Sequence, residues 1–419
     1  MVSGAQSNDL LTPGAVIELT VGDLTHGGAA VARHGEFVDF VAGAAPGERV
    51  RARVTERRRT FARAVVEEVL DASPDRVAPP CPYFGPCGGC QWQFLAYPAQ
   101  LAAKQRILRD QLRRALRLDE RALARILRAP IGMRDPWAYR NVVNVTPDAD
   151  GKPAFRHLHS HTPVAVTHCP ISLPAISAAW AKLTESRIEA ETTIRVGNDG
   201  DVAVYSDETP HAVTLSLLGQ EFRVGGDSFF QVNTKPEQRR DLTGLSPSIG
   251  QAPHSMADIL ARCVLDALAL TGRETIVDAY AGVGTFAILA ARRAHRVIAV
   301  EEMDAAATDA RHNARIAGRD NVLVHARKAE RFLPTLDRQV DAVILDPPRA
   351  GCAPPVLDAL LRLRPGRIVY VSCDPATLAR DLAVLAGGYA LASVQLLDLF
   401  PQTFHLEAVA VLERREEAA

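Results

Sequence analysis

The sequence predicts a multidomain α/β and β protein, in which a small β-barrel and a mixed α+β domain precede a doubly wound α/β domain. Short runs separated by glycine turns near the start, a loop rich in proline, glycine and cysteine, and strands alternating with helices in the last third support this. At 419 residues the chain is too long for one ordinary core. We therefore expect three domains, over residues 10–71, 72–255 and 256–419.

The first predicted domain contains short strands between residues 15 and 69. Apolar and polar residues alternate in these runs, and glycine turns separate them at even spacing. Such a pattern favours a small closed barrel of about five strands. A barrel of this kind either binds nucleic acid or is an appended structural module, and the pattern allows both.

The middle predicted domain begins with a loop. Residues 71–93 are rich in proline and glycine and lack periodicity, which indicates a loop held by something other than a core. Residues 97–118 then show apolar positions at helical spacing, with basic residues on the other face. Strand-like pieces and a helix near residues 173–186 follow, which indicates a mainly antiparallel fold.

The last predicted domain alternates strands with helices, which predicts a doubly wound parallel sheet that binds ligands at the carboxyl ends of its strands. The helices are expected over residues 285–294 and 305–317. The strands are expected over residues 275–282, 295–301, 321–326, 340–348, 366–373 and 391–400.

Charge is unevenly distributed along a chain whose net charge is −1. Residues 49–63 contain seven arginines and one acid, and residues 104–128 contain nine basic residues and three acids. Such clusters suit phosphate contacts, although a solvated arginine-rich face would give the same pattern. No apolar run approaches the ~20 residues that cross a bilayer, and the start resembles no leader peptide. We expect a cytoplasmic monomer without membrane contacts.

A glycine loop follows the first strand of the last domain. Gly282 and Gly284 allow the backbone to pass close to a ligand, but Ala287 stands where a dinucleotide motif has its third glycine. Glu301 ends the second strand, where an acid can accept hydrogen bonds from ribose hydroxyls. The loop fits a nicotinamide cofactor or S-adenosylmethionine, and alone it does not decide between them.

The ends of two later strands carry reactive groups. Asp346 begins an Asp-Pro-Pro turn, and Arg349 stands where an amino-group methyltransferase would have an aromatic residue. Cys373 ends the next strand just before a helix, whose dipole should favour the thiolate. These features predict that Cys373 is a nucleophile, whereas an isolated cysteine is more often an inert packing residue.

Four further cysteines form a C-x5-C-x2-C pattern followed by a distant fourth member that precedes Pro170. A disulfide framework does not suit a long cytoplasmic chain, so metal ligation is the better interpretation. Four thiolates can bind zinc or an iron-sulfur cluster, and zinc ribbons usually show two close pairs. The four residues are Cys81, Cys87, Cys90 and Cys169.

Taken in order, the motifs resemble the RNA uracil-C5 methyltransferase family. The resemblance rests on DSFFQVN (227–233), the glycine loop, DPPRAG (346–351), SCDPATLARD (372–381) and LFPQTFHLEAV (399–409). The leading barrel resembles a TRAM domain, and the four-cysteine pattern points to the branch that carries an iron-sulfur cluster and acts on 23S rRNA. The likeness covers nearly the whole chain.

This resemblance implies a mechanism and its residues. Attack of the Cys373 thiolate on C6 of uracil makes C5 nucleophilic toward the methyl group of S-adenosylmethionine, and a base then removes the C5 proton. The resemblance assigns Glu407 as that base and implies an extruded uridine. It implies a [4Fe-4S] cluster on the four cysteines above. It also assigns the cofactor and base contacts to Gln231, Tyr280, Thr285, Glu301 and Asp346.

Two alternatives remain open at the level of sequence. An enzyme that methylates a tRNA uridine would use the same catalytic set, and an RNA-binding or assembly factor could keep the fold without turnover. The chain departs from the family pattern at Ala281, at Asp374 and in polar residues inserted between Glu237 and His254. None of these departures removes a catalytic group, but the insertion makes one domain boundary uncertain.

Overall fold

The computed structural model describes residues 12–34, 37–158, 160–198, 200–206, 211–237, 254–337 and 339–416. Most of the inserted polar segment, and the outermost residues of the first and last predicted domains, lie outside these ranges. The chain divides into two compact units, one made of Met1–Ile107 and Phe400–His405 and the other of Leu108–Leu399 and Leu406–Ala419. Among the described helices, none is long and apolar enough to span a bilayer.

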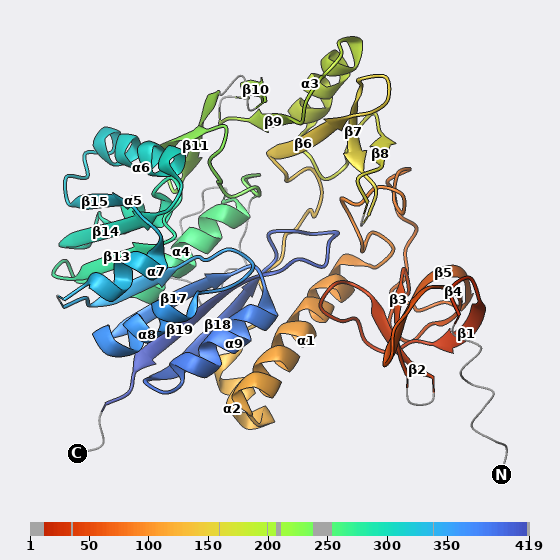
Figure 1. The fold of residues 1–419 in the computed structure, drawn as a ribbon, viewed down its shortest axis with the longest axis horizontal. Helices are drawn as coiled ribbons and strands as arrows, with labels where there is room; N and C mark the ends of the chain where they lie inside the picture. Colours follow the sequence, from red (N-terminus) through yellow and green to blue (C-terminus); the bar gives the residue numbers. More distant parts are fainter. Residues whose placement is uncertain are drawn as a thin grey trace. The chain divides into compact units, whose positions relative to one another are not determined.

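The first unit begins with a five-stranded half-barrel in the order β1-β4-β5-β3-β2, which confirms the predicted short strands (Figure 1). Alternate residues of β4 face the core: Val50, Ala52 and Val54 are almost completely buried. This follows from the two-residue period of a strand. The strands are β1 (Val16–Thr20), β2 (Ala30–His34), β3 (Phe37–Ala42), β4 (Arg49–Arg57) and β5 (Phe61–Asp71).

The arginines between the core positions of β4 are paired with acids. Arg49 contacts Asp71 at 2.7 Å, and Arg53 contacts Glu67 at 2.6 Å. Arg51 lies between acids of both neighbouring strands, Glu18 on β1 and Glu68 on β5. The acids that β1 and β5 contribute therefore balance much of the charge that the linear sequence concentrates in residues 49–63.

A loop and a long helix complete most of the first unit. Residues 72–96 form turns and isolated bridges, as predicted, and α1 (Tyr97–Leu116) follows them. Arg76 anchors the loop to the barrel, because its guanidinium pairs with the fully buried Glu48 at 2.5 Å and lies 4.8 Å from the centre of the Phe94 ring. Trp92 is also fully buried, so the loop has a small core of its own.

The second unit begins with antiparallel structure, as expected. After α2 (Glu120–Ile126), a sheet in the order β10-β9-β6-β7-β8 packs against α3 (Pro174–Glu185). Every strand pair in this sheet is antiparallel. Its strands are β6 (Val142–Pro147), β7 (Pro153–Arg156), β8 (Pro163–Ala165), β9 (Thr192–Val196) and β10 (Val202–Tyr205); a hairpin of β11 (Ala212–Leu217) and β12 (Gln220–Gly225) follows.

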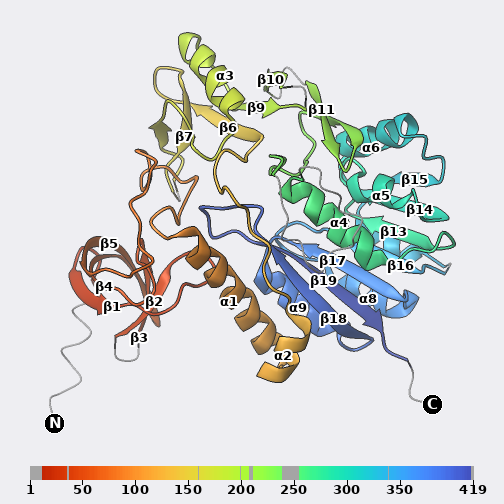
Figure 2. The same ribbon diagram turned by 180° about the vertical axis from the view of Figure 1, so that it is seen from behind.

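The second unit ends with a seven-stranded sheet in the order β15-β14-β13-β16-β17-β19-β18. Figures 1 and 2 show α4 on one face and α8 and α9 on the other. The strands are β13 (Thr275–Ala279), β14 (Arg296–Glu301), β15 (Val322–Ala326), β16 (Ala342–Leu345), β17 (Arg367–Ser372), β18 (Tyr389–Leu397) and β19 (Glu407–Arg414). The helices are α4 (Met256–Leu268), α5 (Thr285–Ala290), α6 (Asp304–Ile316), α7 (Ala329–Phe332), α8 (Pro354–Leu363) and α9 (Pro375–Leu385).

The expectation of a wholly parallel sheet is wrong in one respect. The last strand, β19, lies between β17 and β18 and is antiparallel to both. Its apolar run was not among the predicted strands. β19 therefore begins at the edge of the sheet where β17 and the strands parallel to β17 end.

Candidate active site

Three candidate groups meet at one edge of the seven-stranded sheet. Ser372 pairs with Ala408 across β17 and β19, so the next residue, Cys373, lies at the level of Glu407. Leu345 pairs with Tyr370 across β16 and β17, and Asp346 follows it directly. Because β19 runs antiparallel to β17, its first residue lies at the sheet edge where β16 and β17 end.

The thiol of Cys373 is half-buried in an acidic environment. Burial, the negative charges of Glu407 and Asp346, and to a smaller extent Asp374, raise its pKa to about 12, while Arg349 acts in the opposite direction. These surroundings therefore favour the protonated thiol, in opposition to the helix dipole that the sequence predicts to favour the thiolate. Asp374 caps α9 instead, since its carboxylate accepts hydrogen bonds from the Ala376 and Thr377 amides, both at 2.9 Å.

The two carboxyl groups beside Cys373 share a raised affinity for protons. Burial raises the pKa of Asp346 to about 7. Burial and the charge of Asp346 raise the pKa of Glu407 well above its usual value, and Arg349 partly offsets this. Glu407 is only 4% exposed. The site can therefore hold a proton on a carboxyl group near neutral pH.

The glycine loop follows β13 with a strained backbone. Gly282 and Gly284 have φ angles of +55° and +85°, and Tyr280 adopts +69°, which side-chain-bearing residues rarely do. Glu301 fixes the loop, because its carboxylate accepts hydrogen bonds from the amides of Gly282 and Met303, both at 2.8 Å. Thr285 is the first residue of α5.

Two polar side chains near these elements lack hydrogen-bond partners among the described residues. Asp278, on β13, is 1% exposed and neither of its carboxylate oxygens makes a regular hydrogen bond, although the backbone amide of Ala287 acts to lower its pKa against the effect of burial. The linear pattern indicates no role for Asp278. Gln231 is 7% exposed and its Oε1 is unpaired, although its backbone carbonyl accepts a bond from Asn141. Unpaired buried polar atoms are costly, so both suit contacts with a bound molecule.

A buried network that the sequence did not indicate fixes the loop after Asp346. Asp381, on α9, is completely buried and accepts hydrogen bonds from the Tyr370 hydroxyl at 2.7 Å and the Cys352 amide at 2.8 Å. Arg380 pairs with its other oxygen. A buried carboxylate is recognisable only from the folded structure, because the linear motif gives no sign of its partners.

The four predicted metal ligands lie on two segments. Cys81, Cys87 and Cys90 are on the loop between β5 and α1, in the first unit, and Cys169 lies between β8 and α3, in the second. In the described ranges, no group of three or more histidine, cysteine, aspartate or glutamate side chains is arranged to hold a metal ion. The amide of Gly89 donates a hydrogen bond to the sulfur of Cys87 at 3.5 Å.

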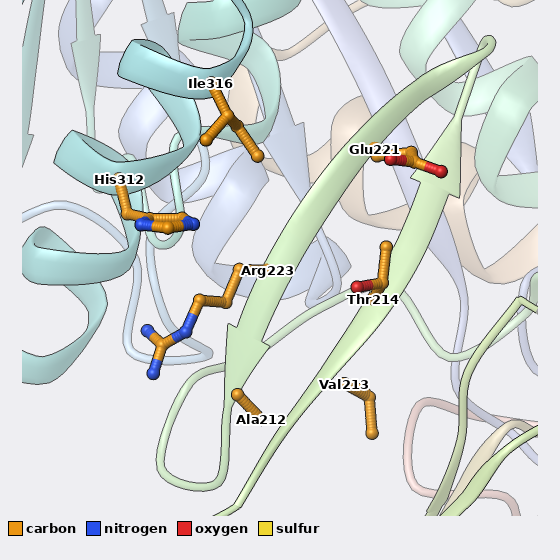
Figure 3. Close-up of a pocket in the computed structure, with 7 residues that line it drawn as sticks. All are labelled: Ala212, Val213, Thr214, Glu221, Arg223, His312 and Ile316. Carbon is orange, nitrogen blue, oxygen red and sulfur yellow. The ribbon is translucent and has the colours of Figure 1, made fainter.

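A pocket of about 230 Å³ lies elsewhere in the second unit and contains none of the predicted site residues. Figure 3 shows that Glu221 and Arg223 of β12, and His312 and Ile316 of α6, line it. Arg223 is engaged in an ion pair with the buried Asp309. This pocket therefore gives no indication of a second reactive centre.

Comparison with known proteins gives the family. The model of the tRNA (Uracil-5-)-methyltransferase family matches residues 248–415, and the TRAM domain model matches residues 11–66. An uncharacterized RNA methyltransferase of Halalkalibacterium halodurans is 34% identical over 467 residues, covering 95% of this chain and 97% of the relative. One from Streptomyces avermitilis is 36% identical over 432 residues, covering 96% and 98%.

A solved structure shares the fold. The tRNA (uracil-54, C5)-methyltransferase of Pyrococcus abyssi, in complex with S-adenosyl-L-homocysteine, superposes with a TM-score of 0.69 at 24% identity, over 94% of this chain and 100% of that one. The family models, the relatives and this fold agree with the resemblance that the motifs indicate. The chain belongs to the RNA uracil-C5 methyltransferase family, carries an N-terminal TRAM domain, and is an S-adenosylmethionine-dependent RNA (uracil-C5)-methyltransferase.

Proposed function

We propose that Cys373 is the nucleophile and Glu407 the general base of this methyl transfer. The observation that carries the proposal is the meeting of β16, β17 and β19 at one sheet edge, where the Cys373 thiol comes under the charge of Asp346 and Glu407. The nucleophile and the base act on adjacent carbons of one uracil ring, so both side chains must lie close to the same bound base.

The reaction proceeds in three steps. The sulfur of Cys373, after losing its proton to solvent, bonds to C6 of the uracil, and the electrons of the C5–C6 double bond move toward O4. C5 then takes the methyl group from the sulfonium of S-adenosylmethionine, which leaves as S-adenosylhomocysteine. Finally Glu407 removes the C5 proton, the C5–C6 double bond forms again, and the C6–S bond breaks.

The protonation state of the site means that two groups must lose a proton during this reaction. Since burial and neighbouring charge favour the protonated forms of Cys373 and Glu407, both must lose a proton before they act. Arg349 favours both ionised forms, because its charge lowers both pKa values. We assign Arg349 the role of keeping this acidic site usable near neutral pH.

The contacts to the methyl donor and the base are proposed from the same set that the motifs suggest. Glu301 keeps free lone pairs for ribose hydroxyls while its two amide bonds hold the glycine loop. Tyr280 and Thr285 flank that loop. The unpaired Oε1 of Gln231 can accept a hydrogen bond from the ring N–H of uracil, and Asp346 serves the flipped base or the donor.

We propose 23S rRNA as the substrate, on the strength of the four-cysteine pattern that accompanies the catalytic motifs. The alternative is a tRNA, since the relative of known structure from Pyrococcus abyssi is named for tRNA uridine 54. Incubating the protein with labelled S-adenosylmethionine and separate unmodified 23S rRNA and tRNA transcripts, then mapping the labelled nucleotide, decides between them. Label in tRNA alone would overturn the rRNA assignment.

We also propose that Cys81, Cys87, Cys90 and Cys169 hold a [4Fe-4S] cluster. Four thiolates are the usual donor set for such a cluster, and an amide N–H to a ligating sulfur, as from Gly89 to Cys87, is a typical supporting contact. The role we assign to the cluster is structural. Zinc bound by the same thiols is the alternative, and metal analysis of protein purified without oxygen distinguishes the two.

The nucleophile is tested with Cys373→Ala. This variant should lose methyl transfer by more than about a thousandfold, because the uracil is no longer activated, while RNA affinity stays within about twofold. Cys263→Ala is the matched control, since Cys263 is a buried cysteine of α4, remote from the strand ends in the sequence. Undiminished methylation by Cys373→Ala would falsify the mechanism.

A further inference from the structure

The segment that leads to Glu407 belongs to a different compact unit from the residues on either side of it. Leu399 and Leu406 belong to the second unit, but the six residues between them, Phe400–His405, belong to the first. We call these six residues the strap. The chain therefore leaves the second unit after β18, is held by the first unit, and returns directly into β19, where Glu407 is two residues beyond the end of the strap.

Gln402 is the centre of the contacts that hold the strap. Its backbone carbonyl accepts hydrogen bonds from the amides of Gln91 and Trp92, at 3.1 and 3.0 Å. Its backbone amide donates to Oε1 of Gln100 at 2.9 Å, and its side-chain Oε1 accepts from Nε2 of Gln100 at 2.9 Å. Gln100 and Gln402 are 0% and 3% exposed, so this double contact is shielded from water.

Gln100 also ties the strap to the cysteine-containing loop. Its Nε2 donates to the carbonyls of Trp92 and Leu95, at 3.1 and 2.8 Å. A second buried residue of α1, Lys104, donates from Nζ to the carbonyl of Phe400 at 3.0 Å. Both contacts come from one face of α1, so a single helix holds both ends of the Phe400–Gln402 stretch.

The backbone of the strap needs this support. Gln402 has a φ angle of +69°, which costs on the order of 1 kcal/mol for a residue with a side chain. Such a conformation persists when its surroundings fix it, and the four hydrogen bonds to the main chain and side chain of Gln402 do so. Loss of Gln100 would remove two of them and allow the strap to relax.

We propose that Gln100 is a positioning residue for the general base, which acts by holding the strap and thereby the start of β19. This inference rests on the proposed role of Glu407. Proton removal is sensitive to the distance between base and C–H bond, whereas attack by Cys373 and methyl transfer do not use Glu407. A relaxed strap should therefore slow the last step selectively, and the methylated RNA should remain bonded to Cys373.

The test compares turnover with the amount of covalent adduct. Gln100→Ala is incubated with unmodified 23S rRNA and tRNA transcripts and methyl-labelled S-adenosylmethionine, and the labelled protein–RNA band that survives denaturing electrophoresis is measured beside released methylated RNA. We expect turnover to fall about tenfold while the labelled adduct rises at least severalfold. Gln402→Ala, which removes only one of the side-chain contacts, should give a smaller change in the same direction.

Two controls separate the possible failures. Gln111→Ala changes a half-exposed glutamine of the same helix and should behave as wild type. Glu407→Gln should accumulate adduct whatever Gln100 does; if it does not, the base assignment fails and this inference falls with it. If Glu407→Gln accumulates adduct but Gln100→Ala and Gln402→Ala lose turnover without adduct, or lose nothing, the positioning role is wrong. Thermal melting confirms that each variant is folded.

Discussion

At the scale of the residue, the shielding of Cys373 opposes its reactivity. It must be shielded so that the covalent adduct is protected, yet burial and the acids around it raise its pKa to about 12. These surroundings therefore favour the protonated thiol at physiological pH. Reactivity is gained only as the proton leaves, which makes the reaction pH-dependent.

Alkylation of Cys373 by iodoacetamide should reflect this. Far below its pKa the thiolate fraction grows about tenfold per pH unit, so the rate should still be rising steeply between about pH 7 and pH 9. The ionised form of Glu407 raises the pKa of Cys373, so Glu407→Gln should accelerate alkylation in the upper part of this pH range, where wild-type Glu407 ionises. The Cys373→Ala protein supplies the background from the other cysteines. A rate that levels off below about pH 8 would contradict the neutral thiol.

Asp346 should make stability depend on pH. Its folded-state pKa is about 7, whereas an aspartate in an unfolded chain titrates near about 3.9, so the folded protein binds the proton more tightly. Wild type should therefore lose stability as pH rises from about 4 to 7. Asp346→Asn cannot ionise, so it should be more stable than wild type by ~1–3 kcal/mol above pH ~7 and similar near pH ~4.

Denaturant unfolding at several pH values measures this difference. Asp358→Asn, at an exposed position of α8, is the matched control and should show a small, pH-independent change. If Asp346→Asn increases the free energy of unfolding equally at acid and neutral pH, ionisation of Asp346 does not destabilise the folded protein.

The motifs at predicted strand ends led to Cys373 and Asp346, because such ends can be recognised in a linear chain, whereas Glu407 was assigned only through the family resemblance. The charge environment could not be predicted in the same way. The buried Asp381 acquires its partners from other elements, Tyr370 on β17 and Cys352 in the loop before α8. Nor does the linear motif show that Asp374 accepts hydrogen bonds from the first amides of α9, or that buried acids surround the Cys373 thiol.

At the scale of elements, the loop from Asp346 to Cys352 depends on its close approach to α9. Gly351 has a φ angle of +75°, and a Cβ there would lie 2.7 Å from Oδ2 of Asp381 and 3.0 Å from Cβ of Thr377. Gly351→Ala should therefore push the loop from α9, disturb Asp346 and Arg349, and destabilise the protein by ~1–3 kcal/mol, with a loss of activity larger than the loss of folded protein.

Gly318→Ala separates backbone strain from this clash. Gly318 also has a positive φ angle, +62°, but an added Cβ would meet nothing within 4 Å. It should lose about 1 kcal/mol and keep full activity per folded molecule. If the two variants lose the same stability and activity, the contact with α9 does not hold the loop.

Elements with strong local signals were predicted well, and those fixed by distant partners were not. The helices α1 and α6 and the strands β13 to β18 follow from hydrophobic spacing, because each carries its own apolar pattern. β19 also has an apolar run, but its direction and its place between β17 and β18 depend on pairing with both. Local pattern contains no information on that choice.

At the scale of the whole molecule, charge shows the same distinction. The arginine run of β4 suggested a phosphate-binding surface, but Glu18, Glu67, Glu68 and Asp71 come from neighbouring strands to pair with it. Likewise, nothing in the linear sequence joins Gln100 to Gln402, which lie 302 positions apart. Those contacts exist only because the strap belongs to the first unit.

The cysteine-containing loop has little regular secondary structure, so its order should depend on the proposed cluster. Residues 72–96 have turns and isolated bridges in place of regular strands, and they supply Gln91 and Trp92, which hold the strap. Loss of one thiolate from four should release the proposed cluster and with it the constraint on this loop. The stability of the first unit should then fall, and the loop should become a site of proteolysis.

Cys90→Ser tests this against Cys263→Ser, which changes a buried cysteine of α4 outside the predicted set. Purified without oxygen, Cys90→Ser should lose iron and the broad absorbance near about 400 nm, and proteinase K should cut within residues 72–96. Cys263→Ser should keep both the colour and the resistance to cleavage. Because the loop also supports the strap, Cys90→Ser should accumulate covalent adduct as Gln100→Ala does. If the wild-type protein is colourless and contains one zinc per chain, the four cysteines bind zinc and not an iron-sulfur cluster. The proposed role of the strap does not depend on this result.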